Sequence, residues 1–434
     1  MTRDFHNLDF RYLVIVPLFF LVGLFIVHQY QAGPPSAPAS INAWVEGMTG
    51  LAMASPTLTP AAPQKSATED RYEQALKKGR ELTKVCRRIS LNFFDGTRAQ
   101  SRKWKEQWPD AAKALSDHQP VLEQAAVEWF FECKKPSNEL LELATGISVQ
   151  AYDAGDFELS WDILQKIKKF HPDADDIMLE RRMSMLAIKT NRFDFAMDFL
   201  RKPDAQMAVE KMEVQLDKNM FLMCPLLAHN WTREKELRDK EAEADDLPRV
   251  KLQLSTGEVV VELYENEAPE TVANFINLVE SGYYDDAIFH PVIKSIVAQT
   301  GLINRSHNTP LGYAIKNESR VPDVRKHYIG TLTVANGSGE DNLLPGRFAI
   351  TLLPNPDLDW DGTDEDTNAQ TAFGRVISGL KHVAALPVTM EIDPETEEQK
   401  TLKVGKPGLI EKATVIRKRE HDYKFEKIRS DEEE

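Results

Sequence analysis

The chain has 434 residues and a formal net charge of −15, with 53 lysine and arginine residues against 68 acidic ones. This length suits two or three domains, and the negative balance argues against a broad nucleic-acid surface, which needs clustered cations. The three cysteines, Cys86, Cys133 and Cys224, match no metal-ligand spacing. Pairing of Cys86 with Cys133 in an oxidising compartment stays open.

An uncharged run rich in Leu, Val, Ile and Phe begins at Tyr12. Residues 12–31 are long enough to cross a hydrocarbon core, so they predict a transmembrane anchor. A cleaved signal peptide is less favoured, because the nearest small-x-small site, at 37–39, contains proline and lies well past the run. Arg3 and Arg11 precede the run, and the next lysine or arginine is Lys65. We therefore expect residues 1–11 in the cytoplasm and the bulk of the chain outside it, on the periplasmic or secretory side.

Residues 32–67 are rich in Pro, Ala and Ser, which is typical of a linker. Helical periodicity dominates 68–246, where segment 155–164 is echoed by 191–200, with small Ser160 matching small Ala196. The pattern resembles tetratricopeptide helix pairs, and a generic antiparallel helical bundle is the alternative. Helical repeats commonly bind proteins, so we predict a protein partner on this domain.

Apolar and polar residues alternate over 250–254 and again over 259–263, with Thr256-Gly257 between them. This pattern predicts a β-hairpin with one buried face. Pro269 then stands where a helix would start, and apolar residues follow at helical spacing until Gly282. A domain that begins with strands is therefore expected over 247–418, followed by a charged tail at 419–434.

Further motifs follow in order: Phe-His-Pro-Val-Ile at 289–293, Ala-Gln-Thr-Gly at 298–301, Gly-Thr-Leu-Thr-Val-Ala-Asn at 330–336, Arg-Phe-Ala-Ile-Thr at 347–351 and Ala-Phe-Gly-Arg-Val-Ile at 372–377. Together with the opening elements they resemble cyclophilin-type peptidyl-prolyl cis-trans isomerases over roughly 249–418. The resemblance implies a closed eight-stranded β-barrel with two capping helices, proline-containing polypeptides as substrates, and no cofactor. The expected fold class is a transmembrane helix, a helical repeat-like domain and this barrel.

Isomerisation of an X-Pro bond crosses a barrier of about 18–20 kcal/mol, because resonance flattens the amide. A donor aimed at the proline nitrogen stabilises the twisted state selectively. In the family that this chain resembles, an arginine in the Phe-His-Arg-Val-Ile motif is that donor. Here its position holds Pro291, which offers neither a side-chain donor nor a backbone N–H.

The resemblance places catalytic groups at Gln299 and Asn336. It places substrate-binding groups at Phe289, His290, Ile296, Val297, Ala335, Arg347, Ala349, Leu358 and Gln370. Several of these depart from the family: Ala349 stands for a pocket phenylalanine, Arg347 for a glutamine, and Gln370 for a histidine. We therefore predict weak or absent isomerase activity. Two alternatives stay open. In the first, Arg347 or Lys294 supplies the missing donor and isomerase activity is restored. In the second, the chain is a non-catalytic scaffold whose barrel and helical-repeat domain bind peptides or proteins.

An acidic loop lies between the last motifs. Asp357, Asp359 and Asp361 alternate before a glycine, and Glu365 follows. Carboxylates at alternate positions before a glycine resemble the first half of a calcium loop. The twelfth position holds Asn368 instead of the glutamate that would bind calcium with both oxygens. A calcium site and a plain acidic surface loop both fit the sequence.

Overall fold

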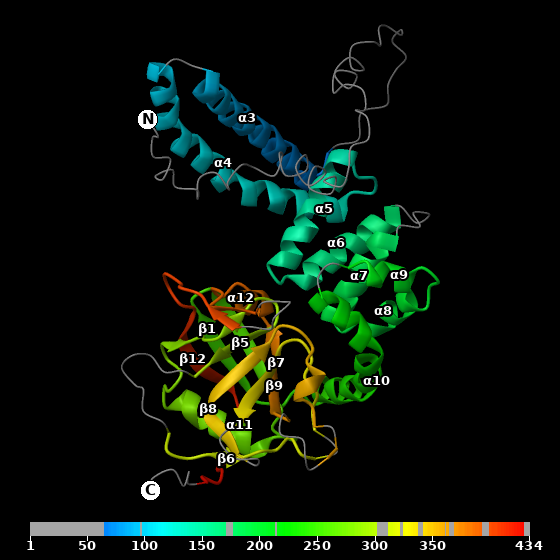
Figure 1. Cartoon of the computed structure of the whole chain (residues 1–434), viewed down its shortest axis with the longest axis vertical. Helices are drawn as coiled ribbons and strands as arrows, with labels where there is room; N and C mark the ends of the chain where they lie inside the picture. Colours follow the sequence, from blue (N-terminus) through cyan, green and yellow to red (C-terminus); the bar gives the residue numbers. More distant parts are fainter. Residues whose placement is uncertain are drawn as a thin grey trace. The chain divides into compact units, whose positions relative to one another are not determined.

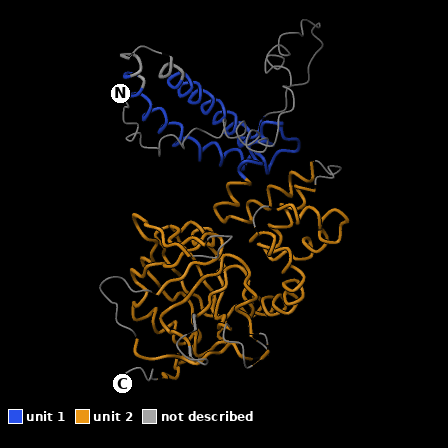
Figure 2. Tube along the Cα trace, viewed as in Figure 1, with its two compact units in different colours: residues 1–147 blue, residues 148–434 orange. Residues whose placement is uncertain are grey.

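The computed structural model describes residues 65–95, 98–170, 177–212, 215–301, 311–321, 324–336, 342–360, 362–363, 369–392 and 399–428. The chain divides into two compact units, residues 1–147 and 148–434 (Figure 2). The division falls inside the predicted helical domain, so its later helices belong to the same unit as the strands.

The predicted transmembrane anchor at 12–31 lies outside the described residues. Among the helices that the structure does describe, none is long and apolar enough to cross a membrane. The predicted fold class is corrected accordingly: a membrane-spanning helix is not part of the fold that the structure describes.

The first unit is built on two long helices, α3 (Ala67–Asp95) and α4 (Arg98–Glu132), which pack along each other. Their facing sides bury apolar residues at helical spacing, including Tyr72, Leu76 and Leu122. Cys86 and Cys133 are both buried in this unit as free thiols. The disulfide that the sequence left open is therefore not formed here. Helix α5 (Asn138–Asp153) crosses the boundary between the units.

The second unit begins with short helices, α6 (Phe157–Phe170), α7 (Ile177–Lys189), α8 (Phe193–Leu200) and α9 (Ala205–Glu210), followed by the longer α10 (Gln215–Ala244). The two predicted repeat copies open at α6 and α8. Each follows a turn residue with positive φ, Gly155 at +74° and Asn191 at +58°. Ser160 and Ala196 are both buried, as expected of small residues at close helix contacts. The tetratricopeptide assignment stays a prediction.

Twelve strands form one curved sheet (Figure 1). They are β1 (Arg249–Leu254), β2 (Gly257–Leu263), β3 (Ala287–Ile288), β4 (Val292–Ile293), β5 (Val297–Thr300), β6 (Ile315–Lys316), β7 (Thr331–Asn336), β8 (Asn342–Thr351), β9 (Thr371–Ser378), β10 (Met390–Ile392), β11 (Gln399–Thr401) and β12 (Leu409–Arg417). The neighbours run β11-β10-β4-β5-β8-β7-β9-β2-β1-β12-β3, and β6 pairs with β8. This open path corrects the predicted closed eight-stranded barrel to a half-barrel of more and shorter strands.

Local predictions within the sheet are confirmed. β1 and β2 pair as the expected hairpin, with Leu254 opposite Gly257. Helix α11 (Pro269–Glu280) starts at the expected proline. Its Phe275 packs on Phe348 and Phe373, with ring centroids 5.3 and 5.2 Å apart, which fixes α11 over the core. Two short elements complete the unit: α12 (Leu380–Ala384) and the 3₁₀ turn η2 (Pro356–Leu358).

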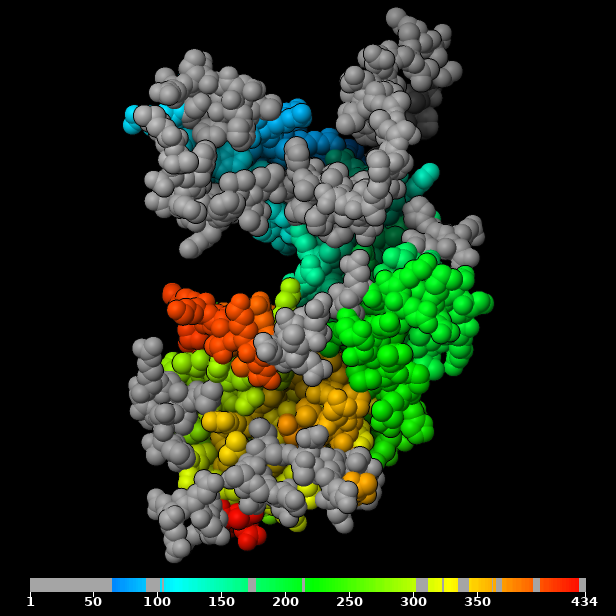
Figure 3. Space-filling model, in the orientation of Figure 1, coloured from blue at the N-terminus to red at the C-terminus, as the bar shows by residue number. Residues whose placement is uncertain are grey.

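Helix α10 is joined to the sheet side of the unit through the buried side chain of Arg325. Its guanidinium lies 3.0 Å from Glu234 and contacts Glu241, both on α10, and stacks 3.7 Å over the ring of Tyr264. Arg375 on β9 also reaches Glu241, at 3.4 Å. Figure 3 shows the helical surface (green) continuous with that of the later strands (orange). The last helix and the sheet therefore form one body.

We expect Arg325→Ala to lower the free energy of unfolding by about 3–5 kcal/mol, because it removes the buried cation that Glu234 and Glu241 share and leaves these carboxylates only Arg238 and Arg375, respectively, among the described cations. The matched control is Arg201→Ala, whose arginine is 69% exposed and pairs with exposed Asp198; it should cost under about 1 kcal/mol. Urea unfolding of the full chain measures both. Equal costs for the two variants would contradict the assigned role of Arg325.

A second prediction concerns Lys189, which is 3% exposed and stacks 5.0 Å over the ring of Phe157. Burial lowers the pKa of Lys189 to about 8, below its ordinary 10.5, with Asp217 opposing the shift. The folded state therefore disfavours the charged form, at a cost of up to about 3 kcal/mol below pH 8. This cost fades as the pH rises from 8 to 10.5, because the unfolded chain then loses the same proton.

Lys189→Met should accordingly raise the free energy of unfolding at pH 7 by about 1–3 kcal/mol. The gain should shrink steadily above pH 8. Exposed Lys211→Met is the control, expected within about 0.5 kcal/mol of the parent. Urea unfolding at pH 7 and pH 10 distinguishes the two, and a gain that is independent of pH would count against a buried charge.

Candidate functional site

Two of the predicted site residues, Gln299 and Ala349, lie on the same face of the sheet. Gln299 in β5 lies opposite Ala349 in β8, and Ala349 lies opposite Thr333 in β7. Side chains alternate along a strand, and Ala298 and Ile350 are fully buried in the core. Gln299 and Ala349 therefore lie side by side on the opposite face of the sheet from Ala298 and Ile350, where Gln299 is half-buried and Ala349 is 8% exposed.

The segment between β3 and β4 brings Pro291 directly beside Gln299. The Gln299 N–H donates to the Pro291 carbonyl at 2.9 Å, and the His290 N–H donates to the Gln299 carbonyl at 2.7 Å. Phe289 is 0% exposed and belongs to the core cluster. It supports the site from beneath. The predicted neighbourhood of Pro291 and Gln299 is thus assembled, with proline where a donor would be needed.

His290 is held by a residue that the sequence did not single out. Its Nδ1 lies 3.0 Å from the hydroxyl of Thr389, which also accepts a hydrogen bond from the Val292 N–H at 2.8 Å. Thr389 is buried. It lies far along the chain from His290, so no local pattern marked the pair.

Ile296 and Val297, predicted to line the proline pocket, are both half-buried. Val297 lies opposite Ile293. Ile296 packs against the cluster formed by helices α6–α10 with Tyr328, Ile329 and Leu353. One side of the predicted pocket is therefore engaged in packing within the molecule.

A buried polar network fixes the other end of the face. Asp359 accepts from the His327 N–H at 2.9 Å and lies 2.8 Å from His327 Nδ1. His327 Nε2 lies 3.0 Å from the Thr333 hydroxyl, which contacts the Gln370 amide at 3.2 Å. The Gln370 N–H donates to the Leu358 carbonyl at 3.0 Å. The network thereby places Leu358 and Gln370 next to Thr333, beside Ala349. His327 lies outside the motifs found in the sequence, and Thr333 lies within the 330–336 motif but is not among the predicted site residues.

The acidic loop is only partly described. Asp359 has a carboxylate oxygen committed to His327, and Asp357 is exposed. Asp361 and Glu365 lie outside the described residues. Within the described part of the chain, no group of three or more His, Cys, Asp and Glu residues is placed to hold a metal ion. The calcium site stays a prediction.

Arg347 lies on the same strand face as Ala349, two residues away. At the end of β5, Gly301 has φ of +96°, and a Cβ there would lie 2.7 Å from the Arg347 Cα. Glycine thus allows β5 to run against the backbone of β8. Burial raises the pKa of Tyr283, and the positive charge of Arg347 partly offsets that rise. Ala335 and Asn336 belong to β7, and their side chains are not among the described ones.

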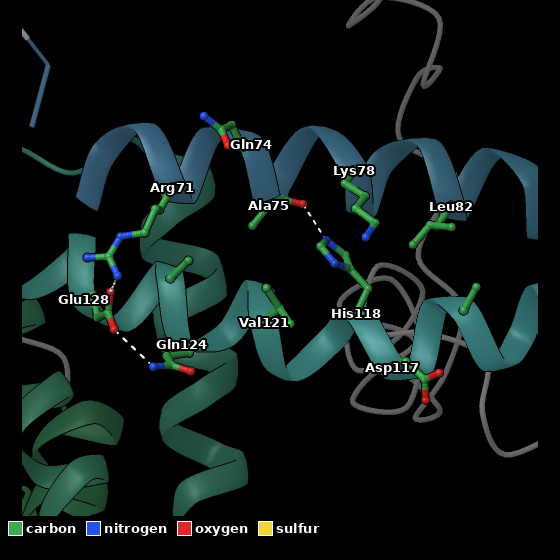
Figure 4. A pocket seen from close by; sticks show the side chains of 12 residues that line it. Arg71, Gln74, Ala75, Lys78, Leu82, Asp117, His118, Val121, Gln124 and Glu128 are labelled. Atoms are coloured by element: carbon green, nitrogen blue, oxygen red, sulfur yellow. Dashed lines mark hydrogen bonds and ion pairs between the residues drawn. The ribbon is translucent and has the colours of Figure 1, made fainter. Parts of the chain in front are cut away.

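A separate groove of about 650 Å³ lies between α3 and α4 in the first unit (Figure 4). At its centre His118 points from α4 to the Ala75 carbonyl on α3, with Nε2 2.7 Å from the oxygen. Arg71 and Glu128 pair across one end at 2.9 Å. These contacts tie the two helices together, and the predicted protein partner of the helical domain stays a prediction.

We expect Asp359→Ala to lower the free energy of unfolding by about 1–3 kcal/mol, because it leaves the buried His327 donors unsatisfied. The control is Asp357→Ala, two residues away and exposed, which should change it by no more than about 0.5 kcal/mol. Urea unfolding of both variants provides the comparison. If the two variants have the same free energy of unfolding, the Asp359–His327 contact does not stabilise the fold.

Comparison with known proteins points to one family. The model of the cyclophilin type peptidyl-prolyl cis-trans isomerase/CLD family matches residues 249–408. The isomerase ppi1 of Schizosaccharomyces pombe is 37% identical over 137 residues, covering 31% of this chain and 81% of its own length. The isomerase cypE of Dictyostelium discoideum is 37% identical over 143 residues, with the same coverages. A solved cyclophilin type isomerase from Cryptosporidium parvum is 23% identical, covers 39% of this chain and 97% of its own, and has a TM-score of 0.30.

Proposed function

This chain belongs to the cyclophilin type peptidyl-prolyl cis-trans isomerase family, and we propose that it binds proline-containing polypeptides while isomerising them weakly. The observation that carries the proposal is the place of Pro291, whose carbonyl is hydrogen-bonded to the Gln299 N–H. The side chain that could hold a substrate carbonyl is therefore kept, and the donor beside it is missing. Absence of one transition-state donor typically costs about 10²–10³ in rate.

The apolar half of the pocket supports the same proposal. Ala349 lies beside Gln299, and its methyl group offers far less surface to a proline ring than an aromatic side chain would. Burial of apolar surface contributes about 25 cal/mol per Å², so the ring is held less firmly. Ile296, on the other side, is already packed against the helical cluster. A face that keeps the glutamine for the substrate carbonyl but offers little apolar surface to the proline ring favours binding over turnover.

The surroundings of Arg347 and Lys294 do not favour either of them as a substitute for the missing donor. The charge of Arg347 acts on Tyr283, and Lys294 is exposed. A cation that stays in water gives a weak hydrogen bond to a reacting amide compared with one in a dry, preorganised site. A location outside the cytoplasm stays a prediction from the sequence.

The proposal is tested by a protease-coupled assay on a proline-containing peptide with the full chain. The parent should accelerate isomerisation only slightly, and Pro291→Arg combined with Ala349→Phe should raise the rate by about 10²-fold. Gln299→Ala in that double variant should remove most of the gain. Circular dichroism of each variant checks that it is folded.

Two results would go against the proposal. A parent as fast as the double variant would show that the donor is supplied elsewhere. A parent that neither accelerates isomerisation nor binds the peptide in fluorescence anisotropy would exclude peptide recognition at this face.

A further inference from the structure

A second groove lies at the edge of the candidate site, between the start of helix α10 and the strands β4, β10 and β11. Its volume is about 1140 Å³. Six apolar side chains line it, all of them half-buried and therefore partly open to solvent: Leu216, Ile293, Ile296, Val388, Met390 and Ile392. The groove is lined mainly by apolar surface that the fold leaves incompletely covered.

The groove continues into the face that carries Gln299. In the sheet register, Met390 of β10 lies opposite Ile293 of β4, and Ile293 lies opposite Val297 of β5. Residues two apart on a strand share a face, so Val297 leads directly to Gln299. Ile296 lines the groove and also occupies a predicted position of the proline pocket. A chain bound at Gln299 therefore has an apolar path along this row.

One wall of the groove lies outside the residues that the family model matches. The family model begins at residue 249, whereas Leu216 and Asn219 belong to α10. The start of this helix is packed into the buried cluster through Met220 and Phe221, and Leu216 packs against the same cluster as Ile296. The wall is therefore held in place by the same fold that holds the sheet.

The rim of the groove carries positive charge in a chain whose net charge is −15. Lys294 and Lys400 are exposed lining residues, and neither forms an ion pair with any residue that the structure describes. Glu391 is the acidic residue among the lining residues of this groove. The excess of unpaired cations favours a ligand that brings a carboxylate to the rim.

The sheet edge favours an extended ligand. β11 is the terminal strand of the path, and its three residues are all exposed. Among the described strands, only β10 pairs with β11, and the other edge of a terminal strand offers backbone donors and acceptors to an added extended segment. A ligand that matches the groove would therefore be an extended peptide with apolar residues that contact the lining and one acidic residue at the rim.

We propose that this groove is a specificity subsite, in which α10 and the β10–β11 edge bind an extended apolar segment of a client polypeptide that carries an acidic side chain next to its apolar residues. The client's proline lies at the Gln299 face, so the subsite rests on the proposed function and names the sequence class that it selects. Leu216 contacts the apolar residues, and Lys294 pairs with the acidic one.

Fluorescence anisotropy with the full chain tests this. The probes are labelled peptides that contain one proline and a neighbouring segment of leucine, valine and aspartate, placed before or after the proline. Leu216→Glu should weaken binding at least about tenfold, because it puts a charge into an apolar contact. Leu222→Glu is the matched control: Leu222 lies on the same helix, is 68% exposed, and does not line the groove.

Charge exchange gives an independent reading. Lys294→Glu should weaken binding of the aspartate peptide and strengthen binding of the same peptide with lysine in its place. This reversal cannot come from loss of folding, so it decides the matter if Leu216→Glu fails to fold in circular dichroism. Gln299→Ala should weaken both peptides equally.

The outcomes separate the two proposals. If Leu216→Glu and Lys294→Glu bind like the parent while Gln299→Ala binds weakly, the subsite is refuted and the proposed function stands. If the parent binds no peptide, both are refuted. If Leu222→Glu weakens binding as much as Leu216→Glu, the effect is not local to the groove, and the subsite is refuted.

Discussion

A buried guanidinium must be paired, and the pairing of Arg325 determines how the second unit is assembled. Its partners, Glu234 and Glu241, both lie on α10, so one side chain ties two points of the helix to the segment that precedes β7. An uncompensated charge at this depth would cost several kcal/mol. The contact therefore joins the end of α10 to the strand side of the unit, while Met220 and Phe221 pack the start of the helix, which forms the wall of the groove beside the candidate site.

With α10 in place, the outer face of the sheet is divided. Ile296 turns into the packing between helices and sheet, whereas Gln299 and Ala349 remain side by side on the face itself. The Asp359–His327 contact limits the face at its other end. The same contacts that stabilise the unit thus limit, at both ends, the surface on which we propose that a peptide lies.

Patterns that repeat over a few residues led to correct predictions. The alternation of apolar and polar residues correctly predicted the β1–β2 hairpin. Pro269 and the helical spacing of the apolar residues after it correctly predicted α11. Both elements depend on local backbone geometry. The anchor at 12–31 is not part of the described fold, since none of the described helices can span a membrane. The prediction of a closed barrel was also wrong, because strand pairing along a sheet depends on partners that are distant in the chain.

The sequence by itself determined the family and the place of Pro291, since motifs are read from the order of residues. It also put Gln299 near that proline, because only a short turn separates them. Only the tertiary structure decided that Thr389 is hydrogen-bonded to His290 and that the Asp359 carboxylate is hydrogen-bonded to His327. It also decided that Leu216 lines the groove beside β10 and β11. The physical reason is that such partners are brought together by the packing of the whole unit, and a one-dimensional pattern carries no record of that packing.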